Sequence, residues 1–75
     1  AMKGNKQILP VHGKEIKSLL NSKGKSQTWL AEQCGVTHSM INHIITGRSI
    51  PSLQLALKIC KALDTTAETI FKDII

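Results

Sequence analysis

The stretch Ser26–Ser52, SQTWLAEQCGVTHSMINHIITGRSIPS, contains two short helical patterns with a glycine between them. Ser26 and Thr37 carry side-chain oxygens of the kind that cap the first turn of a helix. Gly35 suits a tight turn, because glycine reaches the left-handed backbone conformation without a clash at Cβ. We therefore expect a helix that begins at Ser26 and ends near Cys34, a turn at Gly35, and a second helix that begins at Thr37.

The second of these helices is expected to end near Thr46–Gly47, and its side chains divide between two faces. At about 100° per residue, one face is apolar; its members are Met40, Ile41, Ile44 and Ile45. The opposite face is polar and has no permanent charge; it is formed by His38, Ser39, Asn42, His43 and Thr46. Solvated helix faces are usually rich in lysine and glutamate. Hydrogen-bonding side chains of modest length suit the base edges of a DNA major groove, and a solvated neutral face is the alternative.

This stretch indicates neither a metal site nor a catalytic centre. Zinc chelation on a helix uses ligands at i and i+4, whereas His38 and His43 are five residues apart and diverge around the axis. Cys34 and Cys60 lie at apolar helical positions, where a free cysteine commonly acts as a small core residue. We therefore expect no metal, no cofactor and no enzymatic activity.

The flanking sequence adds three more helical patterns, and no alternating β-branched run predicts a strand. One pattern begins at Gly13 and is broken at residues 21–25. Another, at residues 52–63, is apolar around most of its circumference, which predicts the central buried helix. A short last helix begins at Thr65 or Thr66 and brings Phe71 to the core. The expected fold class is all-α, with five helices.

Size and charge limit the class of protein. A chain of 75 residues with 41% hydrophobic residues forms one small domain, which we place at residues 13–75 after a basic arm at residues 1–12. The net charge of +5 comes entirely from residues 1–25. Taken alone, this charge is more typical of a soluble lysine-rich surface; together with other features, it favours an anionic partner. Two cysteines, no signal peptide and no membrane-spanning apolar run favour a cytoplasmic protein.

The assembled residues resemble the phage-repressor/Cro-like helix-turn-helix family, also called xenobiotic-response-element-like transcriptional regulators. The similarity runs from about Ile16 to Phe71 and is strongest in Ser26–Ser52, in the order Ser-Gln, Leu-Ala-Glu, Gly-Val-Thr and a glycine before Pro-Ser. The resemblance implies a λ-repressor-like domain with a helix-turn-helix at helices 2 and 3. Its third helix, at about residues 38–46, is then expected in the major groove of double-stranded DNA.

Carried over position by position, the resemblance implies two sets of DNA contacts. The base contacts are expected from His38, Ser39, Asn42 and His43. The phosphate contacts are expected from Lys25, Ser26, Gln27, Thr46 and Arg48. The expected function is sequence-specific DNA binding by a prokaryotic or phage-type transcriptional regulator, such as a repressor. The alternative is a protein-interaction module on the same fold, either an antitoxin or a co-regulator.

A single domain of this size contacts only a few base pairs, so the expected partner is a near-palindromic operator bound by a homodimer. Ile74 and Ile75, at the end of the sequence, are the candidate dimer contacts. The alternative for these two residues is that they complete the hydrophobic core.

Overall fold

The computed structural model describes residues 9–73, and within this range it contains helices and turns but no strand. The helices are α1 (Val11–Lys23), α2 (Gln27–Cys34), α3 (His38–Ile45), α4 (Leu53–Ala62) and α5 (Ala67–Ile70). The predicted all-α, five-helix fold is therefore confirmed. None of the helices in this range has the length and apolar character needed to cross a membrane.

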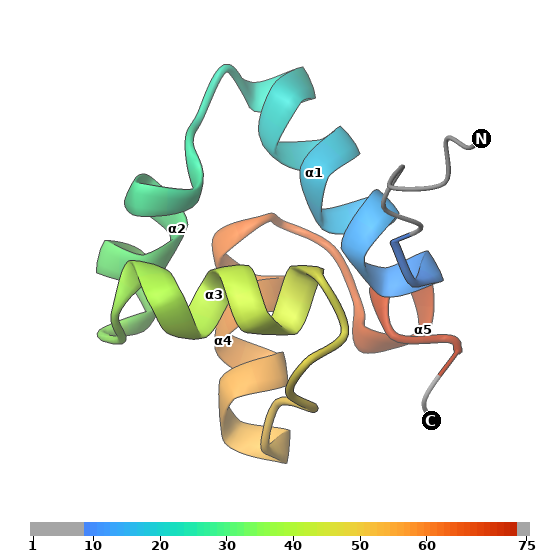
Figure 1. Ribbon diagram of the computed structural model, residues 1–75. Coiled ribbons are helices and arrows are strands. Elements are labelled where there is room, and N and C mark those ends of the chain that lie inside the picture. Colours follow the sequence, from blue (N-terminus) through green and yellow to red (C-terminus); the bar gives the residue numbers. More distant parts are fainter. Residues whose placement is uncertain (1–8, 74–75) are drawn as a thin grey trace, which may run out of the picture.

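Helix α3 lies across the front of the molecule, and the other helices are arranged around it (Figure 1). Helix α2 packs against both α3 and α4, while α1 packs against α3 and α5. Helix α4 also contacts α5, so the pair formed by α2 and α3 is held by α4 through α2 and by α1 through α3. This arrangement leaves the outer face of α3 free of other elements of the described chain (Figure 1).

The helices of the central stretch begin where capping side chains are available. The Ser26 hydroxyl accepts a hydrogen bond from the Trp29 N–H at 3.1 Å, and the Thr37 hydroxyl accepts one from the Met40 N–H at 3.2 Å. Each such cap contributes about 1 kcal/mol. Gly35, with a φ of 70°, ends α2 in the left-handed conformation. Both caps and the turn are as expected from the sequence.

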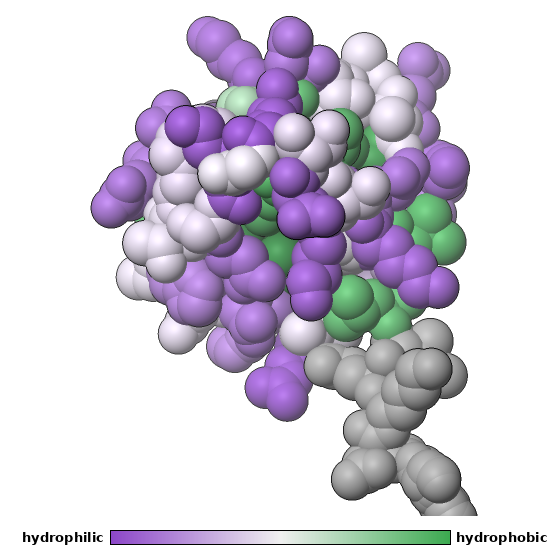
Figure 2. Space-filling view, turned by 90° about the horizontal axis from the view of Figure 1, so that it is seen from above, coloured by the Kyte–Doolittle hydropathy of each residue, from purple (hydrophilic) through white to green (hydrophobic). Residues whose placement is uncertain are grey.

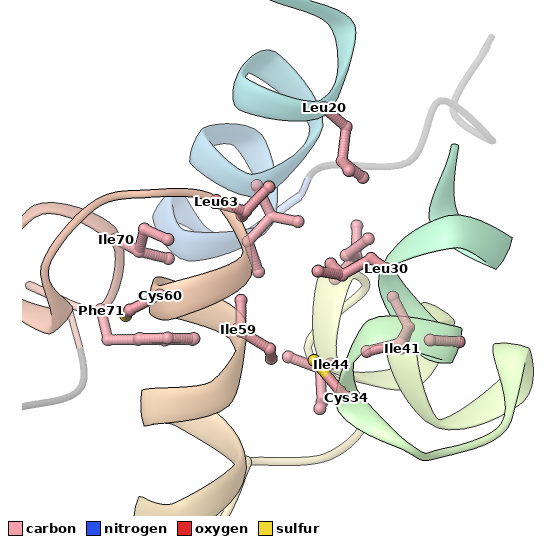
Figure 3. Packing of buried hydrophobic residues seen from close by; sticks show 13 residues of the cluster. Leu20, Leu30, Cys34, Ile41, Ile44, Ile59, Cys60, Leu63, Ile70 and Phe71 are labelled. Carbon is pink, nitrogen blue, oxygen red and sulfur yellow. The ribbon is translucent and has the colours of Figure 1, made fainter. Parts of the chain in front are cut away.

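The core consists of aliphatic side chains from every helix, together with Phe71 (Figure 3). Ile41 and Ile44 of α3 point toward Cys34 of α2 and Ile59 of α4 (Figure 3). Both cysteines are free and buried, so the prediction that they act as core residues is confirmed. The buried aliphatic side of α3 is thus what attaches this helix to the domain.

The prediction that α4 is the central buried helix is wrong. Only Ile59 and Cys60 of α4 are buried, whereas Leu53 is 75% exposed and Leu57 is 52% exposed. Ile50, just before the helix, is also 75% exposed. The physical reason is that the first half of α4 extends below α3 (Figure 1), so that Leu55 and Ala56 pack against the core while Leu53 and Leu57 lie on the exposed side of the helix.

Helix α1 begins at Val11, two residues before the expected start at Gly13, and continues to Lys23 through the expected break. Pro10 occupies the position before the helix, and its carbonyl accepts a hydrogen bond from the Lys14 N–H at 3.1 Å. Residues 11 and 12 of the predicted arm (residues 1–12) therefore belong to α1, whereas residues 9 and 10 precede the helix. Residues 1–8 of the predicted arm lie outside the described residues. Ile74 and Ile75 also lie outside them.

Because Gly13 has no side chain, the backbone of α1 lies directly against the backbone at the end of α3. A Cβ added to Gly13 would overlap the carbonyl oxygen of Ile45 and lie 3.0 Å from its carbonyl carbon. The neighbouring atoms of Ile45 belong to the backbone, so they cannot move away by a change of rotamer as a side chain would. No motif or periodic pattern in the sequence indicates this backbone contact.

Replacing Gly13 by alanine should therefore lower the free energy of unfolding by about 2–3 kcal/mol, since α1 and α3 must separate to admit the methyl group. Urea denaturation of the variant measures this change. Ser18→Ala, at an exposed position of the same helix, is the matched control and should change stability by no more than about 0.5 kcal/mol. A Gly13→Ala protein as stable as the control would show that the two helices adjust freely.

Candidate nucleic-acid interface

The outer face of α3 carries the side chains expected to contact bases. His38 and Ser39 are exposed, and Asn42 and His43 are half-buried at the same surface. On the inner face Ile41, Ile44 and Ile45 are at most 1% exposed, so the predicted division of the helix into two faces holds for these residues. Met40 is the exception: it was expected on the inner face and is 40% exposed, because its position is at the edge between the faces.

The start of α2 brings together the first group of expected phosphate contacts. Lys25 and Ser26 are exposed, and Gln27 is half-buried beside them. The Lys25 ammonium lies 5.4 Å from the centre of the Trp29 ring, so this aromatic ring restrains its position. The Ser26 hydroxyl is occupied as the acceptor of the α2 cap, and it keeps its own proton for a further partner.

An open depression of about 460 Å³ lies between α1 and the start of α2. It is lined by Lys17, Ser18, Leu20, Asn21, Lys25 and Gln27. Hydrophilic side chains project on most of this side of the molecule, above α1 and the connection to α2 (Figure 2). Lys17 thus joins Lys25 and Gln27 in one basic surface, although the sequence pointed only to the latter two. The excess of lysine in residues 1–25 was the available signal.

The end of α3 carries the second group of expected phosphate contacts, Thr46 and Arg48. The Thr46 hydroxyl donates to the Asn42 carbonyl at 2.9 Å, so its single proton already has an acceptor within the helix. Arg48 is exposed, and its backbone N–H donates to the His43 carbonyl at 2.8 Å. Arg48 therefore has an exposed side chain on a fixed backbone, whereas Thr46 must break a hydrogen bond before donating to a phosphate.

A buried histidine that the sequence did not indicate ties the end of α3 to the rest of the domain. His12 of α1 is 3% exposed, and its Nε2 lies 2.9 Å from the Ile44 carbonyl oxygen. Its Nδ1 lies 2.8 Å from the Asp73 carboxylate, and its ring faces Phe71 with 5.7 Å between centroids. One side chain thus connects α1, α3 and the segment after α5.

Both neighbours of the His12 ring are hydrogen-bond acceptors. A neutral imidazole has one N–H donor, so it serves only one of the two, whereas the imidazolium donates to both. The His12 backbone N–H also points to the Asp73 carboxylate, at 3.4 Å, which favours the ionised form of that acid.

Desolvation raises the pKa of Asp73, but hydrogen bonds from the ring and backbone of His12 outweigh it, so the pKa of this carboxyl is below its ordinary value. Burial raises the pKa of the Cys34 and Cys60 thiols, which disfavours the reactive thiolate. In the described part of the chain, no group of three or more histidine, cysteine, aspartate or glutamate residues comes together as a metal site would require.

A capped helix, a glycine turn and a second helix with a polar outer face define a helix-turn-helix domain. The helix-turn-helix family profile matches residues 16–70, and the chain belongs to this Cro/C1-type family. A relative from Bacillus subtilis (strain 168), described as "Uncharacterized HTH-type transcriptional regulator YgzD", is 44% identical over 57 residues, which cover 76% of this chain and 86% of the relative.

These similarities support a DNA-binding regulator, and they do not favour the alternative of a protein-interaction module. The family is generally non-enzymatic.

Replacing Asp73 by asparagine should lower the free energy of unfolding at neutral pH by about 1 kcal/mol, because His12 loses its charged partner. The folded-state pKa of Asp73 lies below its ordinary value of 3.8. The carboxylate therefore stabilises the fold above that pH, and its contribution is lost as the pH falls through the folded-state pKa. The stability difference between wild type and variant should accordingly close between about pH 5 and pH 2 in thermal unfolding.

Glu68→Gln, at an exposed position of α5, is the control for removal of one carboxylate. Its effect at neutral pH should be within about 0.5 kcal/mol. A difference between wild type and Asp73→Asn that is the same at every pH would show that ionisation of the Asp73 carboxyl does not stabilise the fold.

Proposed function

We propose that this protein reads a specific operator sequence, with the outer face of α3 in the major groove. The observation that carries the proposal is that α3 is buried by its aliphatic residues on one side only. Its other side offers His38, Ser39, Asn42 and His43, which are the residues that we propose contact base edges. Amide, hydroxyl and imidazole groups both donate and accept hydrogen bonds, as the pattern of a base pair demands.

We propose phosphate contacts in two groups, one at the start of α2 and the other at the end of α3. At the start of α2 they are Lys25, Ser26 and Gln27, and Lys17 extends the basic surface along α1. At the end of α3 they are Arg48 and, after rearrangement of its hydroxyl, Thr46. Contacts of this kind fix the position of α3 on the duplex without carrying sequence information.

We further propose that the protein acts as a cytoplasmic homodimeric repressor on a near-palindromic operator, because one domain spans too few base pairs to select a site. The prediction that Ile74 and Ile75 form the dimer contact concerns residues outside the described range. No cofactor or metal takes part in this proposal, and no enzymatic activity is assigned.

His38→Ala and His43→Ala should each relax the preference for particular base pairs, since each removes hydrogen bonds to base edges. The expected loss of discrimination is about tenfold at the affected positions. Selecting bound sequences from a random DNA pool, with wild type and each variant in parallel, measures it. Glu68→Ala on α5 is the control and should select the same sequences as wild type. Unchanged preferences in both histidine variants would refute base reading by these side chains.

Lys17→Gln should weaken binding to every sequence alike and reduce the slope of log affinity against log salt by about 1. Titration with the selected DNA at several salt concentrations measures this slope. Lys61→Gln removes the same charge from an exposed position of α4 and should leave the slope nearly unchanged. Equal slopes for the two variants would show that net charge, and not the surface beside Gln27, sets the salt dependence.

A further inference from the structure

Three large aliphatic side chains near the start of α4 are exposed, and we call them the α4 patch (Ile50, Leu53 and Leu57). Ile50 and Leu53 are each 75% exposed, and Leu57, which is one helical turn after Leu53, is 52% exposed. The other exposed large hydrophobic residues of the described chain, Val11 and Met40, are only 42% and 40% exposed. An apolar cluster of this kind on a small domain is typical of a contact surface.

A basic groove continues from the α4 patch along the same helix. The groove is open, has a volume of about 630 Å³, and lies between the end of α2 and the second half of α4. It is lined by Glu32, Gln33, Cys34, Gly35, Lys58, Lys61 and Ala62. Leu53, Leu57 and Lys61 are spaced at i, i+4 and i+8, so they lie along one side of α4. The α4 patch and the groove thus form one surface that is about 12 Å long on this helix.

The cations of this surface have no carboxylate partner within the described chain. The ion pairs there involve only α1 and the segment after α5, and neither Lys58 nor Lys61 takes part. Helix α4 contains no acidic residue, and Glu32 is the one carboxylate among the residues that line the groove. Arg48 adds a third cation just before Ile50. The α4 patch is therefore bordered by an excess of positive charge.

We propose that this surface binds an acidic amphipathic helix of another protein, with apolar residues against the α4 patch and carboxylates against Lys58 and Lys61. An amphipathic helix commonly binds with its apolar face along a groove and its charged residues at the rim. Opposite charges at the rim select the partner and speed its association. This partner is additional to DNA, because the residues proposed to contact DNA include none of the leucines or lysines of α4.

A second copy of this chain does not offer such a helix. Each of α1, α2 and α5 contains a single acidic residue, and α3 and α4 contain none. The cations of two copies would also face each other if their α4 patches met. A flat anionic membrane does not enter the groove, and DNA phosphates leave the aliphatic side chains without an apolar partner. The combination of apolar patch, groove and positive charge accordingly favours a protein helix.

Fluorescence anisotropy of a labelled synthetic peptide, titrated with the 75-residue chain in the absence of DNA, tests the proposal. The probe is a helical peptide of about 16 residues, with leucines at i, i+3, i+4 and i+7 and glutamates beside them. It should bind with a dissociation constant below about 1 mM, and salt should weaken the binding. The same peptide with lysine in place of every glutamate should bind at least about tenfold more weakly.

Two variants of the protein locate the binding site. Leu53→Gln/Leu57→Gln should raise the dissociation constant of the acidic peptide at least about tenfold, because it removes the apolar contact. Lys58→Gln/Lys61→Gln should raise it at least about threefold at low salt, because it removes two cations at the rim. All four residues are exposed, so both variants are expected to fold, and circular dichroism checks this.

Matched controls remove the same kinds of group elsewhere on the domain. Val11→Gln/Met40→Gln replaces the other exposed large hydrophobic residues. Lys17→Gln/Lys25→Gln removes two lysines from the depression between α1 and the start of α2. Both controls should bind the acidic peptide within about twofold of wild type.

The proposal is overturned if the acidic peptide does not bind, if the lysine peptide binds equally well, or if Leu53→Gln/Leu57→Gln binds like wild type. A loss confined to Lys17→Gln/Lys25→Gln would also overturn it, since the peptide would then occupy the basic surface proposed for DNA. Vesicles of phosphatidylserine and phosphatidylcholine that bind through the α4 patch, when the peptide does not bind, would assign the surface to a membrane instead.

The peptide measurement is separate from the proposed function. Lys58→Gln/Lys61→Gln should select the same DNA sequences as wild type while it loses affinity for the peptide. Failure of wild type to prefer any DNA sequence would defeat the proposed function and leave the peptide result intact. Loss of DNA preference in this variant would contradict two separate surfaces and would overturn the assignment of these lysines to a protein partner.

Discussion

The structure depends on the contact between the start of α1 and the last turn of α3. Gly13 leaves no room for a side chain against the Ile45 carbonyl, and His12 donates to the carbonyl of Ile44 beside it. The end of a helix has carbonyl groups without partners in the helix, and burying them unpaired is costly. The Ile44 carbonyl accepts the Gly47 N–H at 3.2 Å, and the His12 ring adds a second, buried partner that ties this end of α3 to α1.

That contact also explains how a short helix can serve as a rigid reading element. Helix α3 has eight residues, too few to be stable in isolation. It is held at its start by the Thr37 cap, along its length by Ile41, Ile44 and Ile45, and at its end by α1. All three restraints act on the inner side or the ends, so the outer polar face stays free for DNA.

Local features of the sequence predicted the helix-turn-helix well, because its determinants are local. Ser26, Thr37 and Gly35 act within a few residues of their own positions, and the two faces of α3 follow from its period. His12 pairs with Asp73, 61 residues away, and no periodic pattern reveals such a pair. The exposure of Leu53 and Leu57 was missed for a related reason. A helix that is apolar around most of its circumference is predicted to be buried within the domain. Exposed apolar residues also occur, however, where a protein contacts another molecule.

The bond between His12 and Asp73 places the tail of the domain in direct communication with the helix that faces DNA. Asp73 follows α5 and shares one imidazole ring with the carbonyl of Ile44. A change in the position of Asp73 would therefore act on this ring and, through the ring, on the end of α3.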